Sequence, residues 1–240
     1  MIFDTFEFSS RGGRSYNEDS VGSRTEGDHG VFVVADGLGG HSYGELASAC
    51  VRDTLLEGFP CRDGDPAQWL ETQIAEANQR VLALQQEKNS VMKSTVAALY
   101  VMGSRAIWAH AGDSRLYCIH EGRIKAYTDD HSVAYKKYKA GEITRRELAF
   151  DEDQSRLLRS IGGVERSTPV VRVYDEFLVP GDAFFLCSDG AWEFLDDEEI
   201  AIDLLKSRTA KQWADYLLLR MMERITGGND NLTVLTVMLK

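Results

Sequence analysis

The sequence predicts an α+β fold in which antiparallel sheets pack on one another and are covered by helices. Segments of strand character are numerous, and some are joined by two-residue turns, which is typical of antiparallel pairing. Segments of helical character fall between groups of strands and do not alternate with single strands. The length of 240 residues and a hydrophobic share of 43% suffice to bury a core, and we expect one domain over residues 1–240.

Eight segments have the length and the β-branched or aromatic content of strands. They are 31–35, 95–102, 105–110, 114–120, 123–128, 170–174, 183–188 and 232–239. Gly103-Ser104 and Glu121-Gly122 separate neighbouring segments as two-residue hairpin turns. We therefore expect a meander of antiparallel strands across the middle of the chain.

Helices are predicted where apolar residues recur three and four positions apart. One such series is Leu70, Ile74, Ala77, Val81 and Leu84, and a second is Ala214, Leu217, Met221 and Ile225. A third helix is expected to start at Asp196, with Glu199 completing a capping box and Leu195 packing on Ile200 as a hydrophobic staple.

Residues 129–163 fit this pattern least, because they are polar and rich in charges of both signs. We interpret them as an excursion from the core with short helices, a flap over a site. Its basic residues are Lys136, Lys137, Lys139, Arg145 and Arg146. They either contact an acidic substrate or form a solvated helix face, and the sequence leaves both interpretations open.

The bulk composition excludes several classes of protein. The formal charge is −11 at pH 7, and since binding a polyanion normally depends on a basic face, we expect no nucleic acid partner. No apolar run approaches the roughly 18 to 20 residues of a membrane-spanning helix, and the first residues lack the pattern of a secretion signal. We therefore expect a soluble, cytoplasmic protein with no membrane partner. The four cysteines lie far apart, which argues against disulfides and a thiolate zinc site.

Four aspartates lie at the ends of predicted strands. Asp36-Gly37 directly follows segment 31–35, Asp189-Gly190 directly follows segment 183–188, Asp230 precedes the last strand, and Asp113 interrupts two further strands. In an antiparallel sheet the ends of some strands share one rim with the starts of their neighbours. We therefore expect these four side chains to converge at one rim.

Convergent carboxylates repel one another unless cations neutralise them. Hard oxygen ligands favour magnesium, manganese or calcium over zinc, so a divalent-metal site is the economical interpretation. The glycine after Asp36 lets a backbone carbonyl approach an ion closely. The alternative is that each Asp-Gly is only a turn after a strand, its commonest role, and the four together favour the metal site.

A second polar cluster lies upstream, where Arg14 precedes Glu18 and Asp19. An arginine can hold a phosphate through two parallel hydrogen bonds, and the carboxylates can orient metal-bound waters. Taken alone, such a stretch is more often a solvated loop.

A series of short polar and glycine-rich motifs spans nearly the whole chain. They are Arg14-x-x-Asn17-Glu18-Asp19, Asp36-Gly37-Leu38-Gly39-Gly40-His41, Gly44-Glu45-x-Ala47-Ser48, Gly112-Asp113-Ser114-Arg115, Ser188-Asp189-Gly190 and Asp230-Asn231-Leu232-Thr233. In these motifs and in their order, the chain resembles the PP2C-type (PPM) metal-dependent protein phosphatases, in their bacterial form.

The resemblance implies a four-layer α-β-β-α sandwich and two Mn²⁺ or Mg²⁺ ions. Asp36 would bridge both ions, the Gly37 carbonyl would bind one, and Asp189 and Asp230 would bind the other. By the same resemblance, Glu18 and Asp19 would bind the ions through water, and Asp113 would help to hold a third, weaker ion. Arg14 would bind the substrate phosphate. The excursion 129–163 would be the family's flap.

The function implied is hydrolysis of phosphoserine and phosphothreonine by a water that bridges two ions, reversing a bacterial Ser/Thr kinase. The expected partners are phosphorylated proteins and a cognate kinase.

Two departures from the family pattern bear on the chemistry. Leu38 stands where some relatives have a histidine assigned as general acid, so another group or a metal-bound water must protonate the leaving oxygen. His41 is a candidate for that role and for a substrate contact, although a loop histidine is as easily structural. Lys93-Ser94-Thr95 replaces the usual Gly-Thr-Thr or Gly-Ser-Thr, which alters a loop near the site without removing a ligand.

Two rival functions fit the sequence less well. Thiolate-based phosphatases need an arginine six positions after the cysteine, and none of the four cysteines has one. A catalytically silent homologue that binds metal and acts through partners would lack a ligand, whereas Arg14 and all four aspartates are present. The sequence therefore favours the enzyme and keeps the silent homologue as the alternative.

Overall fold

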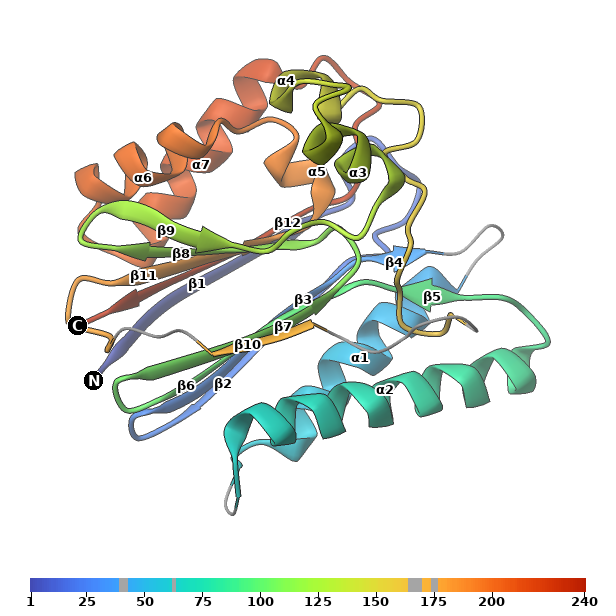
Figure 1. The fold of residues 1–240 in the computed structure, drawn as a ribbon, viewed down its shortest axis with the longest axis horizontal. Coiled ribbons are helices and arrows are strands. Elements are labelled where there is room, and N and C mark those ends of the chain that lie inside the picture. Colours follow the sequence, from blue (N-terminus) through green and yellow to red (C-terminus); the bar gives the residue numbers. More distant parts are fainter. Residues whose placement is uncertain (39–42, 62–63, 164–169, 174–176) are drawn as a thin grey trace.

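The computed structural model describes residues 1–38, 43–61, 64–163, 170–173 and 177–240. Two five-stranded antiparallel sheets lie face to face, and helices cover the outer face of each, so that four layers follow one another (Figure 1). The expected α-β-β-α arrangement is confirmed. Among the described residues, no helix is long and apolar enough to cross a membrane.

The first sheet has the order β1-β12-β11-β8-β9. Its strands are β1 (Phe3–Ser10), β12 (Leu232–Leu239), β11 (Ala183–Cys187), β8 (Arg115–His120) and β9 (Arg123–Tyr127). The register pairs Phe3 with Leu239 at one end and Ser10 with Leu232 at the other. Backbone hydrogen bonds between Ile2 and Lys240 continue this pairing, so the two chain ends lie side by side.

The second sheet has the order β10-β7-β6-β3-β2. Its strands are β10 (Val170–Val173), β7 (Arg105–Ala111), β6 (Val96–Met102), β3 (His29–Ala35) and β2 (Ser20–Glu26). A small pair, β4 (Gly37–Leu38) and β5 (Lys93–Ser94), extends beyond β3. All eight predicted strands are present, with shifts of one or two residues at some ends; Tyr174 lies outside the described residues.

The predicted meander is wrong. Both hairpins form, but β6 and β7 belong to one sheet while β8 and β9 belong to the other. The chain crosses between sheets at Gly112, whose φ of +105° is a conformation that side-chain-bearing residues rarely adopt. This crossing leaves Asp113 at the rim between the two sheets.

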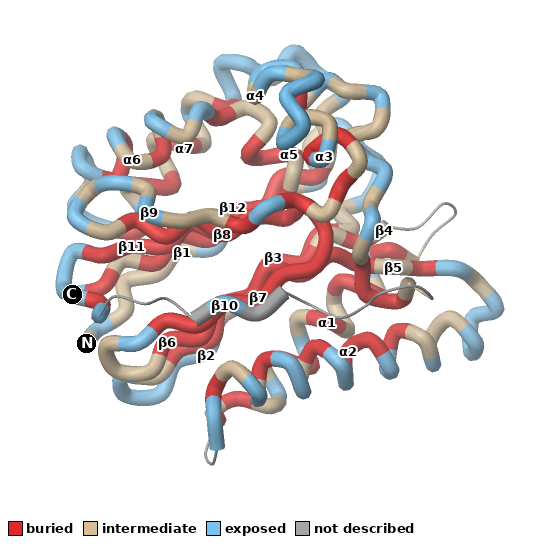
Figure 2. Tube along the Cα trace, viewed as in Figure 1, coloured by how far each residue is buried: buried red, intermediate tan, exposed pale blue. Residues whose placement is uncertain are grey.

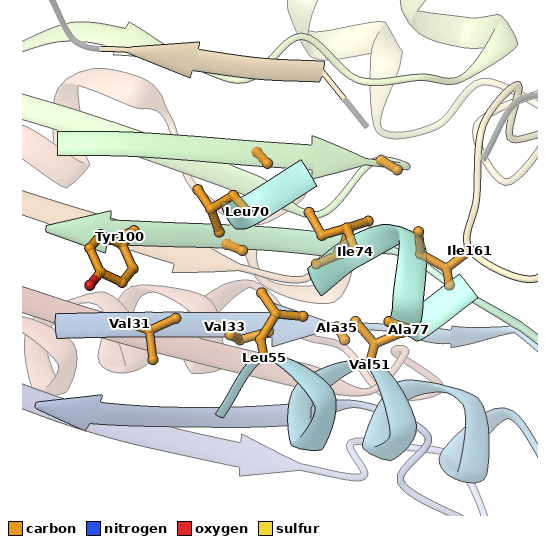
Figure 3. Packing of buried hydrophobic residues seen from close by; sticks show 14 of the residues in the cluster. Val31, Val33, Ala35, Val51, Leu55, Leu70, Ile74, Ala77, Tyr100 and Ile161 are labelled. Atoms are coloured by element: carbon orange, nitrogen blue, oxygen red, sulfur yellow. The ribbon is translucent and has the colours of Figure 1, made fainter. Parts of the chain in front are cut away.

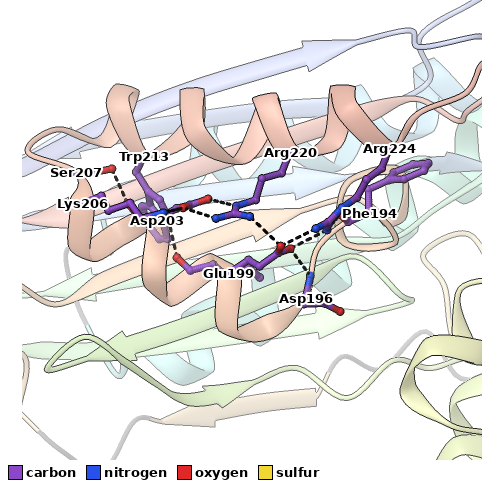
Figure 4. A network of polar contacts seen from close by, with 10 residues as sticks. Phe194, Asp196, Glu199, Asp203, Lys206, Ser207, Trp213, Arg220 and Arg224 are labelled. Carbon is purple, nitrogen blue, oxygen red and sulfur yellow. Dashed lines mark hydrogen bonds and ion pairs between the residues drawn. The ribbon is translucent and has the colours of Figure 1, made fainter.

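Helices α1 (Gly44–Gly58) and α2 (Pro66–Lys88) cover the second sheet, while α6 (Asp197–Lys206) and α7 (Ala210–Arg224) cover the first. The three predicted helices are confirmed. Glu199 accepts the Asp196 backbone N–H at 3.1 Å, which completes the predicted capping box. Figure 4 shows the ion pairs that join α6 to α7: Arg220 pairs with both Glu199 and Asp203, and Arg224 pairs with Glu199.

Three apolar clusters separate the four layers. Strand β3 illustrates why, since successive residues point to opposite faces of a sheet. Val31, Val33 and Ala35 pack against α1 and α2 (Figure 3), whereas Phe32 and Val34 pack between the sheets. Both faces of the strand are therefore buried, which accounts for its continuous apolar run and for the buried centre of the molecule in Figure 2.

The flap, residues 129–163, leaves the first sheet after β9 and carries α3 (Val133–Ala140) and α4 (Arg145–Leu148), as predicted. Its base is tied to the rim by backbone hydrogen bonds from His131 to Gly112 and between Ile161 and Ser94. The last short helix, α5 (Asp189–Trp192), lies beside the flap and directly follows β11.

Candidate metal and phosphate site

One rim of the sandwich carries most of the predicted site residues. Asp36 follows β3, Asp189 opens α5 after β11, Asp230 lies two residues before β12, and Asp113 lies where the chain crosses between sheets. All four line one cavity of about 930 Å³ together with Arg14, Glu18, Gly37 and Leu38. The expected convergence of the aspartates at one rim therefore holds in the structure. His41 lies outside the described residues.

The segment Lys93-Ser94-Thr95 positions the backbone of Asp36. Thr95 Oγ1 accepts the Asp36 N–H at 2.9 Å, and the Thr95 N–H donates to the Asp36 carbonyl at 2.8 Å. Ser94 Oγ donates to the same carbonyl at 3.0 Å, and Ser94 and Lys93 pair with Gly37 and Leu38. The departure from the family pattern thus leaves Asp36 firmly held.

Gly37 allows two chain segments to approach closely. Its N–H donates to the Glu18 carbonyl at 3.1 Å, and a β-carbon at this position would collide with the carbonyl oxygen of Gly44. A β-carbon on Gly44 would in turn collide with the Glu18 carboxylate. Side chains are therefore excluded from the place where the Gly37 carbonyl and the Glu18 side chain meet.

Asp19 contacts Ser188, the residue that precedes Asp189. Asp19 is buried, and Ser188 Oγ donates to its Oδ2 at 2.7 Å, while its buried Oδ1 has no hydrogen-bond partner among the described residues. The same part of the chain gives the buried Asp113 Oδ1 no partner either. Such orphaned carboxylate oxygens are costly unless a cation or proton accompanies them, so both residues fit a cation-binding role.

The electrostatics of the rim also favour a cation-binding role for its carboxylates. Burial, followed by repulsion from neighbouring aspartates, raises the pKa of Asp36, Asp113 and Asp189 above the usual range of a carboxyl group. Burial likewise raises the pKa of Asp19 to about 7. The only charge partner that the described residues give Asp230 is Arg14, whose Nη2 lies 2.7 Å from Oδ2. The donor set is all oxygen, which suits hard divalent ions.

The rim carboxylates line the same cavity, but their oxygen atoms do not converge on one position. Within the described residues, no three Asp, Glu, His or Cys side chains are close enough together to form a ready-made metal-ligand group. Arg14 contacts Asp230, and Gln154 of the flap donates to Asp189 Oδ2 at 3.3 Å. The rim is an open set of oxygen donors, unlike the closed cage of a structural metal site.

Three residues of the site had no role in the sequence analysis. Asn231 accepts the Glu18 N–H through Oδ1 at 2.8 Å and donates through Nδ2 to the carbonyls of Tyr16 and Arg11. Gln154 and Glu193 line the cavity, and burial raises the pKa of Glu193 to about 8. Asn231 lies inside a recognised motif, so its position was visible; the other two became apparent only through the fold.

The flap's basic residues are largely engaged within the protein. Lys137 contacts Asp151 and Asp153 at 2.8 Å each, and Lys139 lies 3.9 Å from Asp129. Arg145 lies 3.4 Å from Asp197 of α6. These contacts favour a structural role over an acidic-substrate contact for these three side chains.

Comparisons with known proteins assign the family. A model of the family described as Protein phosphatase 2C matches residues 9–225. The chain is 31% identical over 236 residues to the serine/threonine phosphatase stp of Listeria welshimeri, covering 93% of this chain and 90% of that protein.

Solved structures agree. The Mycobacterium tuberculosis serine/threonine phosphatase PstP/Ppp is similar with a TM-score of 0.87 and 29% identity, over 100% of both chains. A structure of the PstP catalytic domain in complex with two manganese ions has a TM-score of 0.84 and 29% identity, over 99% of this chain and 98% of that chain.

A family model that covers most of the chain, and a fold that matches a solved serine/threonine phosphatase over its whole length, define the class of protein. The chain belongs to the protein phosphatase 2C family. It is a metal-dependent phosphoprotein phosphatase, as the motifs predicted.

Proposed function

We propose that this phosphatase hydrolyses phosphoserine and phosphothreonine in proteins by means of two divalent ions held at the acidic rim. The observation that carries the proposal is the gathering of Asp36, Asp189, Asp230 and Arg14 around one cavity. The relatives named as serine/threonine phosphatases support the substrate class. We also propose that residues 1–240 form one catalytic domain, since both sheets contribute to one shared apolar cluster.

The proposed ions are Mn²⁺ or Mg²⁺. Asp36 would contact both ions, the Gly37 carbonyl one, and Asp189 and Asp230 the other, while Glu18 and Asp19 would act through waters and Asp113 would serve a third, weaker ion. When bound, the pair of ions supplies a bridging water acidified enough to attack phosphorus near neutral pH, and positive charge opposite the phosphoryl oxygens.

The chain's own residues then have distinct tasks. Arg14 is exposed at the cavity mouth, and its guanidinium can exchange its contact with Asp230 for two parallel hydrogen bonds to the substrate phosphate. Leu38 lines the cavity but carries no proton to donate, so the leaving serine or threonine oxygen must take its proton from water or from another group of the cavity.

A cysteine nucleophile is not available as an alternative. Cys61, Cys118 and Cys187 are buried and Cys50 is half-buried, and burial raises the pKa of the Cys50 and Cys187 thiols above their ordinary value. Since the thiolate is the nucleophilic form, Cys187 would be inert. Direct attack by water, with no phospho-enzyme, is the route that the cavity supports.

The opposing enzyme would be a Ser/Thr kinase, and the partners would be its phosphorylated substrates. A panel of phosphoproteins separates a broad phosphatase from one with a single dedicated substrate.

The first test compares wild type with Asp36→Asn and Asp189→Asn on a phosphothreonine peptide, with Mn²⁺, with Mg²⁺ and with EDTA. Loss of an ion ligand should lower kcat by at least about 100-fold, because charge stabilisation at the transition state is usually the largest single contribution. Asp215→Asn is the matched control, since Asp215 pairs with Lys211 on α7 and is not among the residues that line the cavity.

Mn²⁺ binding, measured by calorimetry, completes this experiment. Wild type that hydrolyses the peptide only with metal, together with weakened binding in both rim variants, supports the proposal. Wild type that binds Mn²⁺ but hydrolyses no phosphopeptide would instead support a silent, partner-binding homologue.

A further inference from the structure

Trp192 connects two of the rim aspartates. It lies on α5, three residues after Asp189, and is buried. Its indole Nε1–H donates to the backbone carbonyl of Asp113 at 2.9 Å. Because α5 starts at Asp189, a displacement of Trp192 would disturb the backbone at both aspartates.

Two arginines lie against the Trp192 ring. The Arg115 guanidinium carbon is 3.5 Å from the ring centroid, and Arg115 donates to both carboxylate oxygens of Asp130 at 2.7 and 2.6 Å. Both side chains are 1% exposed. Asp130 lies at the start of the flap, so this fixed stack ties the flap's base to α5.

Arg145 approaches the same ring from the flap. It is the first residue of α4, and its guanidinium carbon lies 5.4 Å from the Trp192 centroid. Its Nη2 lies 3.4 Å from Asp197 Oδ1, at the start of α6. A planar guanidinium can stack on an aromatic ring and pair with a carboxylate at the same time, which an ammonium group does less well.

We propose that Arg145 is a positioning residue that couples the flap to the rim through Trp192. The path runs from α4 to the Trp192 ring and from its indole N–H to Asp113, with Asp189 on the same short helix. The inference rests on the proposed function for its catalytic consequence, but the mechanical coupling can be measured without any turnover.

The neighbouring Arg146 gives a natural comparison. It belongs to the same helix and is exposed, whereas the Arg145 side chain is 28% exposed and contacts both Trp192 and Asp197. If α4 offered a cation to substrates, Arg146 would be the better placed of the two. Arg145 is placed to hold the flap.

The test is hydrogen–deuterium exchange on the full chain with Mn²⁺, followed by mass spectrometry, for wild type, Arg145→Ala, Arg145→Lys and Arg146→Ala. In Arg145→Ala we expect amide exchange to accelerate by roughly tenfold in residues 145–150 and also in residues 111–116, because local opening propagates along packed contacts. Arg145→Lys should fall between, and Arg146→Ala should match wild type. Acceleration confined to residues 145–150 would overturn the coupling.

A second variant, Trp192→Phe, keeps an aromatic ring for both arginines but removes the N–H donor to Asp113. It should accelerate exchange in residues 111–116 alone. In a double-mutant cycle with Arg145→Ala, kcat on a phosphothreonine peptide should fall less than the product of the single effects, since both changes interrupt one path. Independent, multiplicative effects would reject the path. Wild type without turnover would reject the proposed function, while the exchange results would still decide the coupling.

Discussion

Asn231 holds the loop of residues 11–18, which carries Arg14, in place. Its amide bonds to the backbone at Glu18, Tyr16 and Arg11, so one side chain holds the loop that carries Arg14 against the start of β12. Buried backbone groups that lose such partners cost roughly 1–3 kcal/mol each.

Asn231→Ala should therefore loosen the loop without unfolding the protein. We expect the KM for a phosphopeptide to rise by about tenfold, which corresponds to roughly 1.4 kcal/mol and to the loss of one such contact. Steady-state kinetics check this, with circular dichroism to verify the fold and Gln79→Ala, exposed on α2, as the control. An unchanged KM in a folded variant would show that other contacts hold the loop.

The site residues divide by how far the sequence could reveal them. Asp36, Asp189 and Asp230 could be found because each adjoins an apolar strand, and antiparallel pairing brings strand ends to one rim. The role of Asn231 could not be found this way, because its partners lie up to 220 positions away. Gln154 likewise reaches Asp189 from a flap whose path no periodicity describes.

The α6–α7 pair is an element whose stability should depend on pH. The hydrogen bond from Arg224 lowers the pKa of Glu199. Burial raises the pKa of Asp203, but hydrogen bonds from Arg220 and Lys206 outweigh it and leave the pKa lowered. Figure 4 shows how both carboxylates face the arginines of α7.

The sign follows from proton linkage. Because the folded pKa values lie below the unfolded ones, the unfolded chain binds more protons as the solution is acidified. This stabilisation is therefore fully present above the unfolded carboxyl pKa of about 4 and is lost progressively as the pH falls from there through the folded pKa. Glu199→Gln should thus lower the free energy of unfolding by about 1 kcal/mol at pH 7.

Urea unfolding of wild type and Glu199→Gln between pH 3 and 7 measures the effect. The difference between the two proteins should shrink as the pH falls through the folded pKa of Glu199. A difference that stays constant, or grows on acidification, would show that the Arg224 contact contributes nothing through charge.

Among the elements, strength of pattern decided what could be predicted. The capping box at Asp196 and the long series on α2 are local signals, and both were correct. Strand β2 was missed because its sequence, SVGSRTE, has only Val21 as a large apolar residue. The prediction of a meander was wrong because the chain passes from one sheet to the other at Gly112. Packing between the layers determines this crossing, and the periodicity of the strands gives no sign of it.

For the whole molecule, we predict that the acidic rim makes stability depend on divalent ions. Ions that bind only the folded state stabilise it by roughly 2.7 kcal/mol at 100 times the dissociation constant. For a chain of 240 residues this corresponds to a rise in Tm of about 5–10 °C.

Calorimetric scans should therefore give a higher Tm with MnCl₂ than with EDTA. A NaCl sample of equal ionic strength controls for screening of the net charge of −11. Asp36→Asn should lose most of the rise and Asp215→Asn none of it. An equal rise in Asp36→Asn, or an equal rise with NaCl, would place the stabilising ions elsewhere.

The adjacent chain ends lie at the end of the sandwich opposite the rim. Strand β1 pairs with β12 from Phe3 and Leu239 to Ser10 and Leu232, and Asp230 lies just beyond the second pair. Eight paired residues span about 23 Å at 3.3 Å per residue. A fluorescent reporter or a surface-attachment tag fused at either end would therefore leave the cavity accessible, and a short peptide joining the two ends would permit circularly permuted versions for immobilised assays.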